Sequence, residues 1–206
     1  MSTDTQATIT ESSRPKAGER AVQILQALVL MLEDPAGMSE GRVTTAALAK
    51  KVGVSEAALY RHFASKAKMF EGLIEFIEST LLGLTAQIAR QEGGKLAKVN
   101  ALIHVLLEFA VRNKGMTRVL VGEALMTENP RLQARMNDLI NNLETSIKQG
   151  LREAALAGEL PANDDVAARA NALTSYVLGR WLRYSKSGFK LSPVDGYAAQ
   201  AAILLA

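Results

Sequence analysis

The stretch VTTAALAKKVGVSEAALYRHFASKAKMF, residues 43–70, decides how the rest of this sequence is interpreted. It contains two very short helical patterns, separated by Gly53-Val54-Ser55, and it continues into a much longer apolar one. An isolated helix shorter than about 12 residues is marginal in water, so the short helices must be held by packing against other parts of the chain. Two short helices joined by a Gly-containing turn predict a helix-turn-helix, whose second helix enters the major groove of DNA.

The composition indicates a helical protein with a sizeable core. The chain has 206 residues, of which 48% are hydrophobic and only 5% are aromatic. This length suits one large domain, or a small domain joined to a larger one. The sequence contains no Cys, which excludes disulfides and thiolate chemistry and is compatible with a reducing cytoplasm.

The first 18 residues are polar with scattered apolar positions, and we expect a disordered tail there. They lack the apolar segment of a signal peptide, and no later stretch is a continuous apolar run long enough to span a bilayer. The sequence therefore predicts a cytoplasmic protein without a membrane partner.

Positive charge is concentrated around the two short helices. Residues 42–68 carry six basic side chains and a single acidic one, Glu56, whereas residues 19–41 are acidic overall. A local basic patch attracts polyanions more strongly than the same charge spread over a surface. The alternative is an ordinary solvated basic face.

Apolar residues recur at helical spacing along most of the chain, and no strand signal of comparable strength is found. Thr44 or Thr45 can cap the first short helix, and Ser55 and Ser65 can cap the two helices that follow. The prediction is an all-α fold with a tail at 1–18, a helix-turn-helix head at 19–66 and a helical body at 67–206. Helical patterns are expected at 19–33, 45–52, after Ser55, after Ser65, at about 95–113, beyond 115, at about 136–158, at 166–184 and after Pro193.

The short helices carry the candidate DNA contacts. The small side chains of Ala57 and Ala58 let the backbone of the second short helix approach base edges, and Arg61 attracts the phosphate backbone. Hydroxyl, imidazole and ammonium groups can donate hydrogen bonds to phosphates, and Glu56 lies in the first turn of the same helix. The complete candidate set is Thr44, Thr45, Ser55, Glu56, Ala57, Ala58, Tyr60, Arg61, His62 and Lys66. A pair of packing helices with exposed lysines is the alternative.

The pattern T-T-x-x-L-A-x-x-V-G-V-S-x-x-A-L-Y-R-H-F-x-S-K, from Thr44 to Lys66, resembles the DNA-binding signature of the TetR family at every anchor. The resemblance implies an all-helical homodimer with a three-helix DNA-binding head, a helical body and a palindromic double-stranded DNA site.

One aromatic residue of the body stands apart from the core pattern. On a helical wheel Phe76 points about 120° away from the stripe that contains Phe70, Ile77 and Ile88, beside the small residues Gly72, Ser79 and Gly83. Such a face can form a shallow groove for a partner peptide, or another helix of the same chain can pack there.

A further resemblance bears on that face. The segments SEAALYRHFASKAKMFEGLIEFIEST, RNKGMTRVLVGEALM and RLQARMNDL are similar to a TetR-like group of nucleoid occlusion factors, which inhibit the division GTPase FtsZ over unsegregated chromosomes. It implies binding of the FtsZ C-terminal tail at positions that here are Phe76, Arg112 and Asn113, and Gly83 of the same outer face completes the candidate partner surface. Leu84 and Glu108 depart from that group, in which Arg and Gly are expected.

The later helices are expected to hold the dimer. The apolar stripes at 136–151 and 166–184 can form a four-helix bundle across a two-fold axis, and they can equally belong to the core of one chain. Val177, Trp181 and Tyr184 are the predicted dimer contacts.

An enzyme is not expected, and no cofactor or metal is predicted. His104 and Glu108 are four residues apart, which fits a surface hydrogen bond better than a catalytic or metal-binding pair. Gly93-Gly94-Lys95-Leu96 lacks the full phosphate-loop spacing and is interpreted as a turn. Two functions remain: a nucleoid-associated division inhibitor that binds DNA and FtsZ, and a ligand-responsive TetR-type transcriptional repressor.

Overall fold

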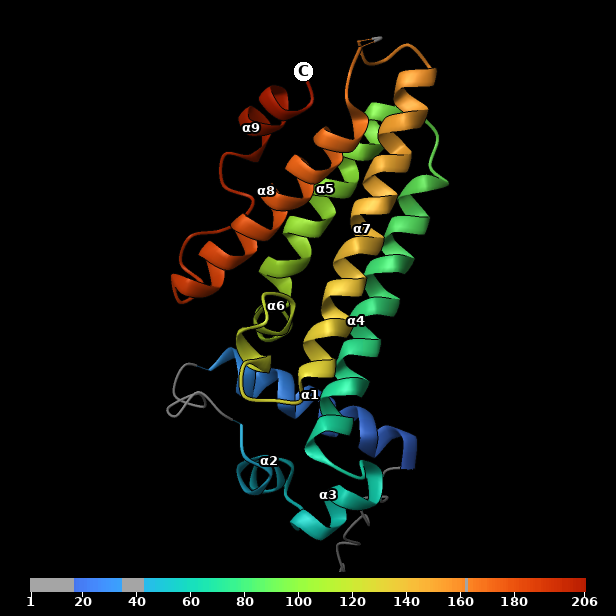
Figure 1. Cartoon of the computed structure of the whole chain (residues 1–206). Helices are drawn as coiled ribbons and strands as arrows, with labels where there is room; N and C mark the ends of the chain where they lie inside the picture. The colour runs from blue at the N-terminus through green and yellow to red at the C-terminus, as the bar shows by residue number, and fades with distance from the viewer. Residues whose placement is uncertain (1–16, 35–42, 162) are drawn as a thin grey trace, which may run out of the picture.

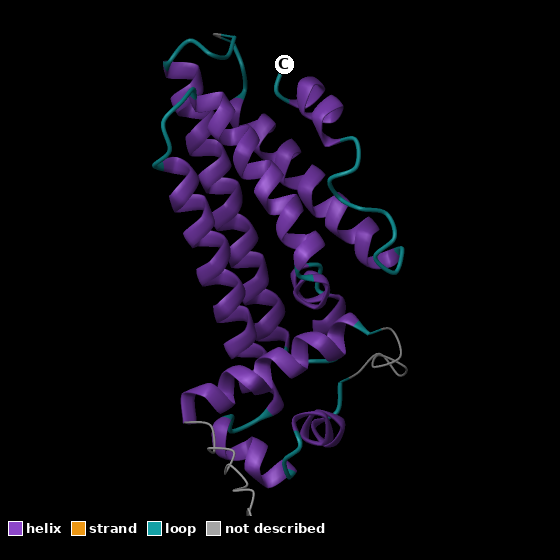
Figure 2. Cartoon of the chain, turned by 180° about the vertical axis from the view of Figure 1, so that it is seen from behind, coloured by secondary structure: helices purple, strands orange, loops and turns teal. Residues whose placement is uncertain are grey.

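The computed structural model describes residues 17–34, 43–161 and 163–206. Of the disordered tail expected at 1–18, residues 1–16 lie outside the described residues, whereas Ala17 and Gly18 belong to the first helix. Throughout the described ranges every regular element is a helix, as the colouring in Figure 2 shows. The predicted all-α fold is confirmed.

The helices divide into a small group at one end and a bundle of long helices (Figure 1). α1, α2 and α3 form the head, and α4, α5, α7 and α8 run side by side to form the body, with α6 at the base of the body next to α1. The bounds are α1 Ala17–Glu33, α2 Thr45–Val52, α3 Glu56–His62, α4 Lys66–Ala89, α5 Lys95–Arg112, α6 Lys114–Leu120, the short 3₁₀ turn η2 Glu123–Leu125, α7 Pro130–Leu156, α8 Val166–Lys186 and α9 Tyr197–Leu204.

Side-chain caps determine where the head helices start and stop. The Oγ atoms of Thr44, Ser55 and Ser65 accept backbone N–H bonds at the starts of α2, α3 and α4. Gly53 ends α2 in the left-handed conformation, with φ of 74°, which a side chain would disfavour. Gly53 and Ser55 thus bound the tight turn between the two short helices.

The body core is built from the apolar faces of its long helices. Seven residues of α4 are buried, including Phe70, Ile74 and Ile77, and seven residues of α5 between Val99 and Ala110 are buried as well. Trp181 of α8 is completely buried and donates its indole N–H to the carbonyl oxygen of Leu106 on α5, at 2.9 Å. This buried hydrogen bond fixes the position of α8 against the centre of the bundle.

α1 belongs to the head by sequence order but packs against α6 of the body. Gly115 on α6 lies so close to α1 that an added Cβ would be 2.1 Å from the carbonyl oxygen of Val29. The head is therefore seated on the body through a backbone approach that only glycine permits.

Among the described residues, α4 is long and apolar enough, by length and composition, to cross a membrane. Its buried stripe packs in the helical core, and its exposed faces carry charged residues such as Lys68 and Glu75. Core helices of water-soluble domains satisfy the same length and composition test.

Candidate DNA interface and partner surface

α3 presents most of its side chains outward. Leu59 is buried and anchors the helix to the head, whereas Glu56, Ala57, Tyr60, Arg61 and His62 are exposed. The exposed Ala57 leaves the backbone at the start of α3 accessible from outside. A slim, exposed helix start of this kind fits a DNA major groove.

A hydrogen-bond chain connects α2 to α3. Thr45 Oγ1 donates to Glu56 Oε2 at 2.7 Å, and the Tyr60 hydroxyl lies 3.5 Å from Thr45 Oγ1. Glu56 is thus held by α2, which suggests that it orients α3 as well as facing outward. The hydroxyl hydrogen of Tyr60 can still turn to a phosphate, because a bond of 3.5 Å is weak.

The other residues predicted to contact phosphates lie on or next to the same helices of the head. Thr44 Oγ1 accepts the N–H of Ala47 and keeps its own hydroxyl hydrogen for a second partner. Ser55 Oγ accepts the N–H of Ala58 in the same way. Lys50 and Lys51 are exposed at the end of α2. Lys66 differs, because its ammonium lies against Glu128 of the body. These DNA contacts stay predictions.

The predicted partner surface lies on α4 and α5, which pack side by side. Phe76 is 52% exposed, and the position of Gly83 faces open space. The side chain of Arg112 is 77% exposed and pairs with Glu108 at 3.0 Å. Asn113 is half-buried and donates to the carbonyl oxygen of Phe109, where α5 gives way to α6.

Gly72 is not part of that open surface. An added Cβ there would meet a ring carbon of Phe63 at 3.2 Å and a methyl of Leu25 at 3.6 Å. The small residue at this position lets the head pack against α4. The outward face predicted around Phe76 is therefore shorter than the helical wheel indicates.

The three residues predicted as dimer contacts lie in the core of one chain. Val177, Trp181 and Tyr184 are buried inside one chain, with at most 3% of each exposed. A side chain that is already covered cannot contribute area to a contact with a second copy. The neighbouring Leu182 is 44% exposed and Leu178 is half-buried, and both border a groove of about 520 Å³ between α7 and α8 with Ile140 and Asn137.

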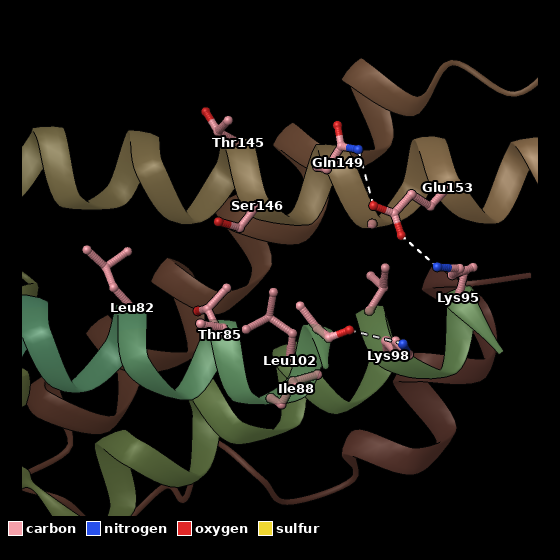
Figure 3. Close-up of a pocket in the computed structure, with 14 residues that line it drawn as sticks. Leu82, Thr85, Ile88, Lys95, Lys98, Leu102, Thr145, Ser146, Gln149 and Glu153 are labelled. Atoms are coloured by element: carbon pink, nitrogen blue, oxygen red, sulfur yellow. Dashed lines mark hydrogen bonds and ion pairs between the residues drawn. The ribbon is translucent and has the colours of Figure 1, made fainter. Parts of the chain in front are cut away.

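A second groove, of about 500 Å³, lies between α4, α5 and α7 (Figure 3). Its floor is aliphatic, with Leu82, Ile88 and Leu102, and no aromatic ring lines it. At one end Lys95 binds Glu153 at 2.9 Å, and this bond lowers the pKa of Glu153. The ammonium of Lys98 donates to the carbonyl oxygen of Ala89 at 3.1 Å. The polar groups at this end of the groove therefore already have partners.

The two residues considered for catalysis each contact a different partner. His104 stacks on Tyr197, with ring centroids 5.4 Å apart, while Glu108 pairs with Arg112. Within the described ranges no group of three or more His, Cys, Asp or Glu side chains could hold a metal ion.

The glycine segment before α5 forms a turn, as predicted. The backbone N–H groups of Leu96 and Lys95 donate to the carboxylate of Glu159, at 2.7 and 3.0 Å, and these bonds lower the pKa of Glu159. A carboxylate of the same chain thus occupies the donors that a phosphate would use.

The head and the bundle together define a TetR-type helix-turn-helix regulator. The family model described as "Bacterial regulatory proteins, tetR family" matches residues 41–73, and the SlmA-like "Tetracyclin repressor-like, C-terminal domain" matches residues 94–206. The chain is 50% identical to the nucleoid occlusion factor SlmA of Idiomarina loihiensis over 88% of this chain and 91% of that one. It is 48% identical to SlmA of Alteromonas mediterranea over 90% and 93%. The chain belongs to the SlmA family of nucleoid occlusion factors.

Solved structures agree with this assignment at the level of the fold. The fatty acid degradation regulator FadR from Bacillus halodurans superposes with a TM-score of 0.76 at 16% identity, covering 93% of this chain and 97% of that one. The transcriptional regulator FadR from Bacillus subtilis, solved with stearoyl-CoA, gives 0.74 at 16% identity, covering 90% and 97%. The matching families are regulators rather than enzymes.

Proposed function

We propose that this protein inhibits cell division over the chromosome. Its head binds a palindromic DNA site in the nucleoid, and the α4–α5 surface of its body binds the C-terminal tail of FtsZ and blocks assembly of the division ring. The relatives named nucleoid occlusion factor SlmA, at 50% and 48% identity over most of the chain, support this role.

The exposure of Phe76 is the observation that best supports the proposed binding of FtsZ. A phenylalanine with 52% of its surface exposed is unusual on a helix whose other aromatic, Phe70, is buried. Exposed aromatic residues are typical anchors of peptide interfaces. Beside it Gly83 leaves room for a peptide backbone, and Arg112 offers a cation to a carboxylate.

The same proposal requires a homodimer, and α7 with α8 is the surface that suits it. Leu178 and Leu182 of α8 lie next to Ile140 of α7 around the α7–α8 groove, with Asn137 and Asn141 at its edge. Two copies that join these faces form a four-helix bundle and place two heads on one side of the dimer. Two heads related by a two-fold axis match a palindromic site.

A ligand-responsive repressor is the competing function, and the groove between α4, α5 and α7 is the place to look for its ligand. Ligand pockets present polar groups that converge on the bound molecule. Here the hydroxyls of Thr85, Thr145 and Ser146 donate to carbonyl oxygens of their own helices, and Lys95 binds Glu153. The groove therefore offers a ligand few free donors, which favours the division inhibitor.

Titration of the FtsZ C-terminal tail tests the proposal. A fluorescent tail peptide is titrated with the purified protein, with and without the DNA duplex that random-sequence selection returns. We expect saturable binding of the peptide and a palindromic duplex. A protein that binds the duplex but not the peptide would leave the repressor as the better account.

A further inference from the structure

Lys66 stands at the junction of the head and the body. It is the first residue of α4, four residues after the last residue of α3, and its ammonium lies 2.5 Å from Glu128 Oε1. The side chain of Lys66 is 26% exposed and that of Glu128 only 10% exposed. The lysine that the sequence assigns to a DNA phosphate is thus bound by a carboxylate of the body, 62 residues further along the chain.

Glu128 is held firmly enough to compete for this lysine. Its backbone N–H donates to the carbonyl oxygen of Leu125 at 3.0 Å, and Asn129, the next residue, caps α7. The ammonium of Lys66 also lies 5.8 Å from the centre of the Phe70 ring, within the range of a cation–π interaction. The two partners need little further ordering to form their bond.

Two more ion pairs join α4 to α7, next to the pair of Lys66 with Glu128. Arg131 of α7 binds Glu71 of α4, and Arg135 binds Glu78 through both carboxylate oxygens. The hydrogen bond to Glu78 raises the pKa of Arg135. The Lys66–Glu128 pair includes the first residue of α4 and is therefore the member of this series nearest the DNA-binding head.

We propose that Glu128 is a positioning residue for DNA binding, which competes with a DNA phosphate for Lys66 and so restrains the affinity of the head. This inference rests on the proposed DNA binding. When a phosphate takes Lys66, the carboxylate loses its partner, and the start of α7 changes its surroundings. Even when Lys66 contacts both groups, the negative charge of Glu128 opposes the phosphate.

Glu128 and a DNA phosphate offer Lys66 similar charge-assisted bonds, so removing one competitor should have a modest effect. We expect a change of about fivefold in affinity for each subunit, which corresponds to about 1 kcal/mol. Glu128→Gln removes the charge and keeps the shape, so it should tighten DNA binding by about that factor. Lys66→Ala should weaken binding and reduce the slope of log affinity against log salt by about one for each subunit.

Fluorescence anisotropy with a labelled duplex tests the inference on the full-length protein. The duplex is the palindrome returned by selection, and each variant is melted first to show that it is folded. Asp138→Asn is the matched control, because Asp138 is an exposed carboxylate on α7 and its replacement changes the net charge equally. The double variant Lys66→Ala with Glu128→Gln completes a double-mutant cycle, which measures the coupling between the two residues.

We expect Glu128→Gln to bind the duplex more tightly than both the wild type and Asp138→Asn. The gain should vanish when Lys66 is already absent. Equal affinities of Glu128→Gln and wild type, or a gain that survives in the double variant, would overturn the inference. A wild-type protein that binds no duplex would instead overturn the proposed function.

Discussion

Phe76 and Ile77 are neighbours on α4, yet Ile77 is completely buried while Phe76 is 52% exposed. The difference follows from helix geometry, because consecutive residues point about 100° apart. Ile77 belongs to the stripe that packs in the bundle. Phe76 falls on a face that no part of the described chain covers completely.

Replacing Phe76 should therefore separate binding from stability. Phe76→Ala should leave the melting temperature nearly unchanged, whereas truncation of a buried Phe costs about 3–5 kcal/mol. We expect binding of the FtsZ tail to be lost and DNA affinity to survive, since the head is untouched. Melting, tail titration and DNA titration on one protein measure all three.

Leu82→Ala is the matched control for this experiment. Leu82 is another exposed apolar residue of α4, but it lines the groove that α4 forms with α5 and α7. Its replacement should leave tail binding unchanged. Early melting of Phe76→Ala, or normal tail binding by it, would remove Phe76 from the partner surface.

Tyr60 should contribute a phosphate contact through its hydroxyl. Tyr60→Phe removes only the oxygen, so DNA affinity should fall by about 1–3 kcal/mol while the fold is kept. Tyr176→Phe is the control, because Tyr176 uses its hydroxyl on Gln200 in the body. Anisotropy titrations at matched salt give the comparison, and equal affinities for Tyr60→Phe and wild type would contradict the contact.

The dimer face can be tested with one charge. Leu182→Glu places a carboxylate on the outer face of α8, beside the α7–α8 groove, and should convert the dimer to folded monomers. Leu156→Glu makes the same change at a side chain that is 90% exposed at the end of α7, and it should stay dimeric. Sedimentation velocity distinguishes the two. A dimeric Leu182→Glu would require another interface.

Two glycines on helices should respond in opposite ways to alanine. Gly115→Ala should lower the free energy of unfolding by more than about 2 kcal/mol, since its Cβ would collide with the backbone of Val29. Gly83→Ala should raise it by about 0.5–1 kcal/mol, because alanine favours the helix and the position is open. Urea unfolding monitored by circular dichroism measures both. A neutral Gly115→Ala would contradict the close packing of α6 on α1.

The sequence predicts the helices well because their signals are local. The caps Thr44, Ser55 and Ser65 and the stop at Gly53 each act within four residues, and apolar periodicity locates the long helices. Some boundaries differ. α1 begins at Ala17, two residues before the predicted start at Glu19, and α7 begins at Pro130, six residues before the expected start near residue 136.

The partner against which an apolar helix stripe packs depends on residues far away in the sequence. The sequence therefore does not predict that partner. Helical spacing marks Trp181 as buried, but it cannot tell a neighbouring helix from a second copy of the chain. The bond from Trp181 to Leu106 joins residues 75 positions apart. Gly72 was assigned to the outer face for the same reason, because Leu25 and Phe63 come from other helices. The ion pair of Lys66 with Glu128 likewise joins residues 62 positions apart, so local sequence patterns do not predict it.

The central claim is that DNA-bound protein blocks FtsZ assembly through its α4–α5 surface. Pelleting of FtsZ polymers formed with GTP measures this directly, with the wild type or Phe76→Ala added together with the palindromic duplex. The account predicts that wild type with DNA strongly reduces the pelleted FtsZ, while Phe76→Ala with the same DNA leaves it at the level of FtsZ alone. Full assembly in the presence of DNA-saturated wild type, or equal inhibition by the two proteins, would contradict it.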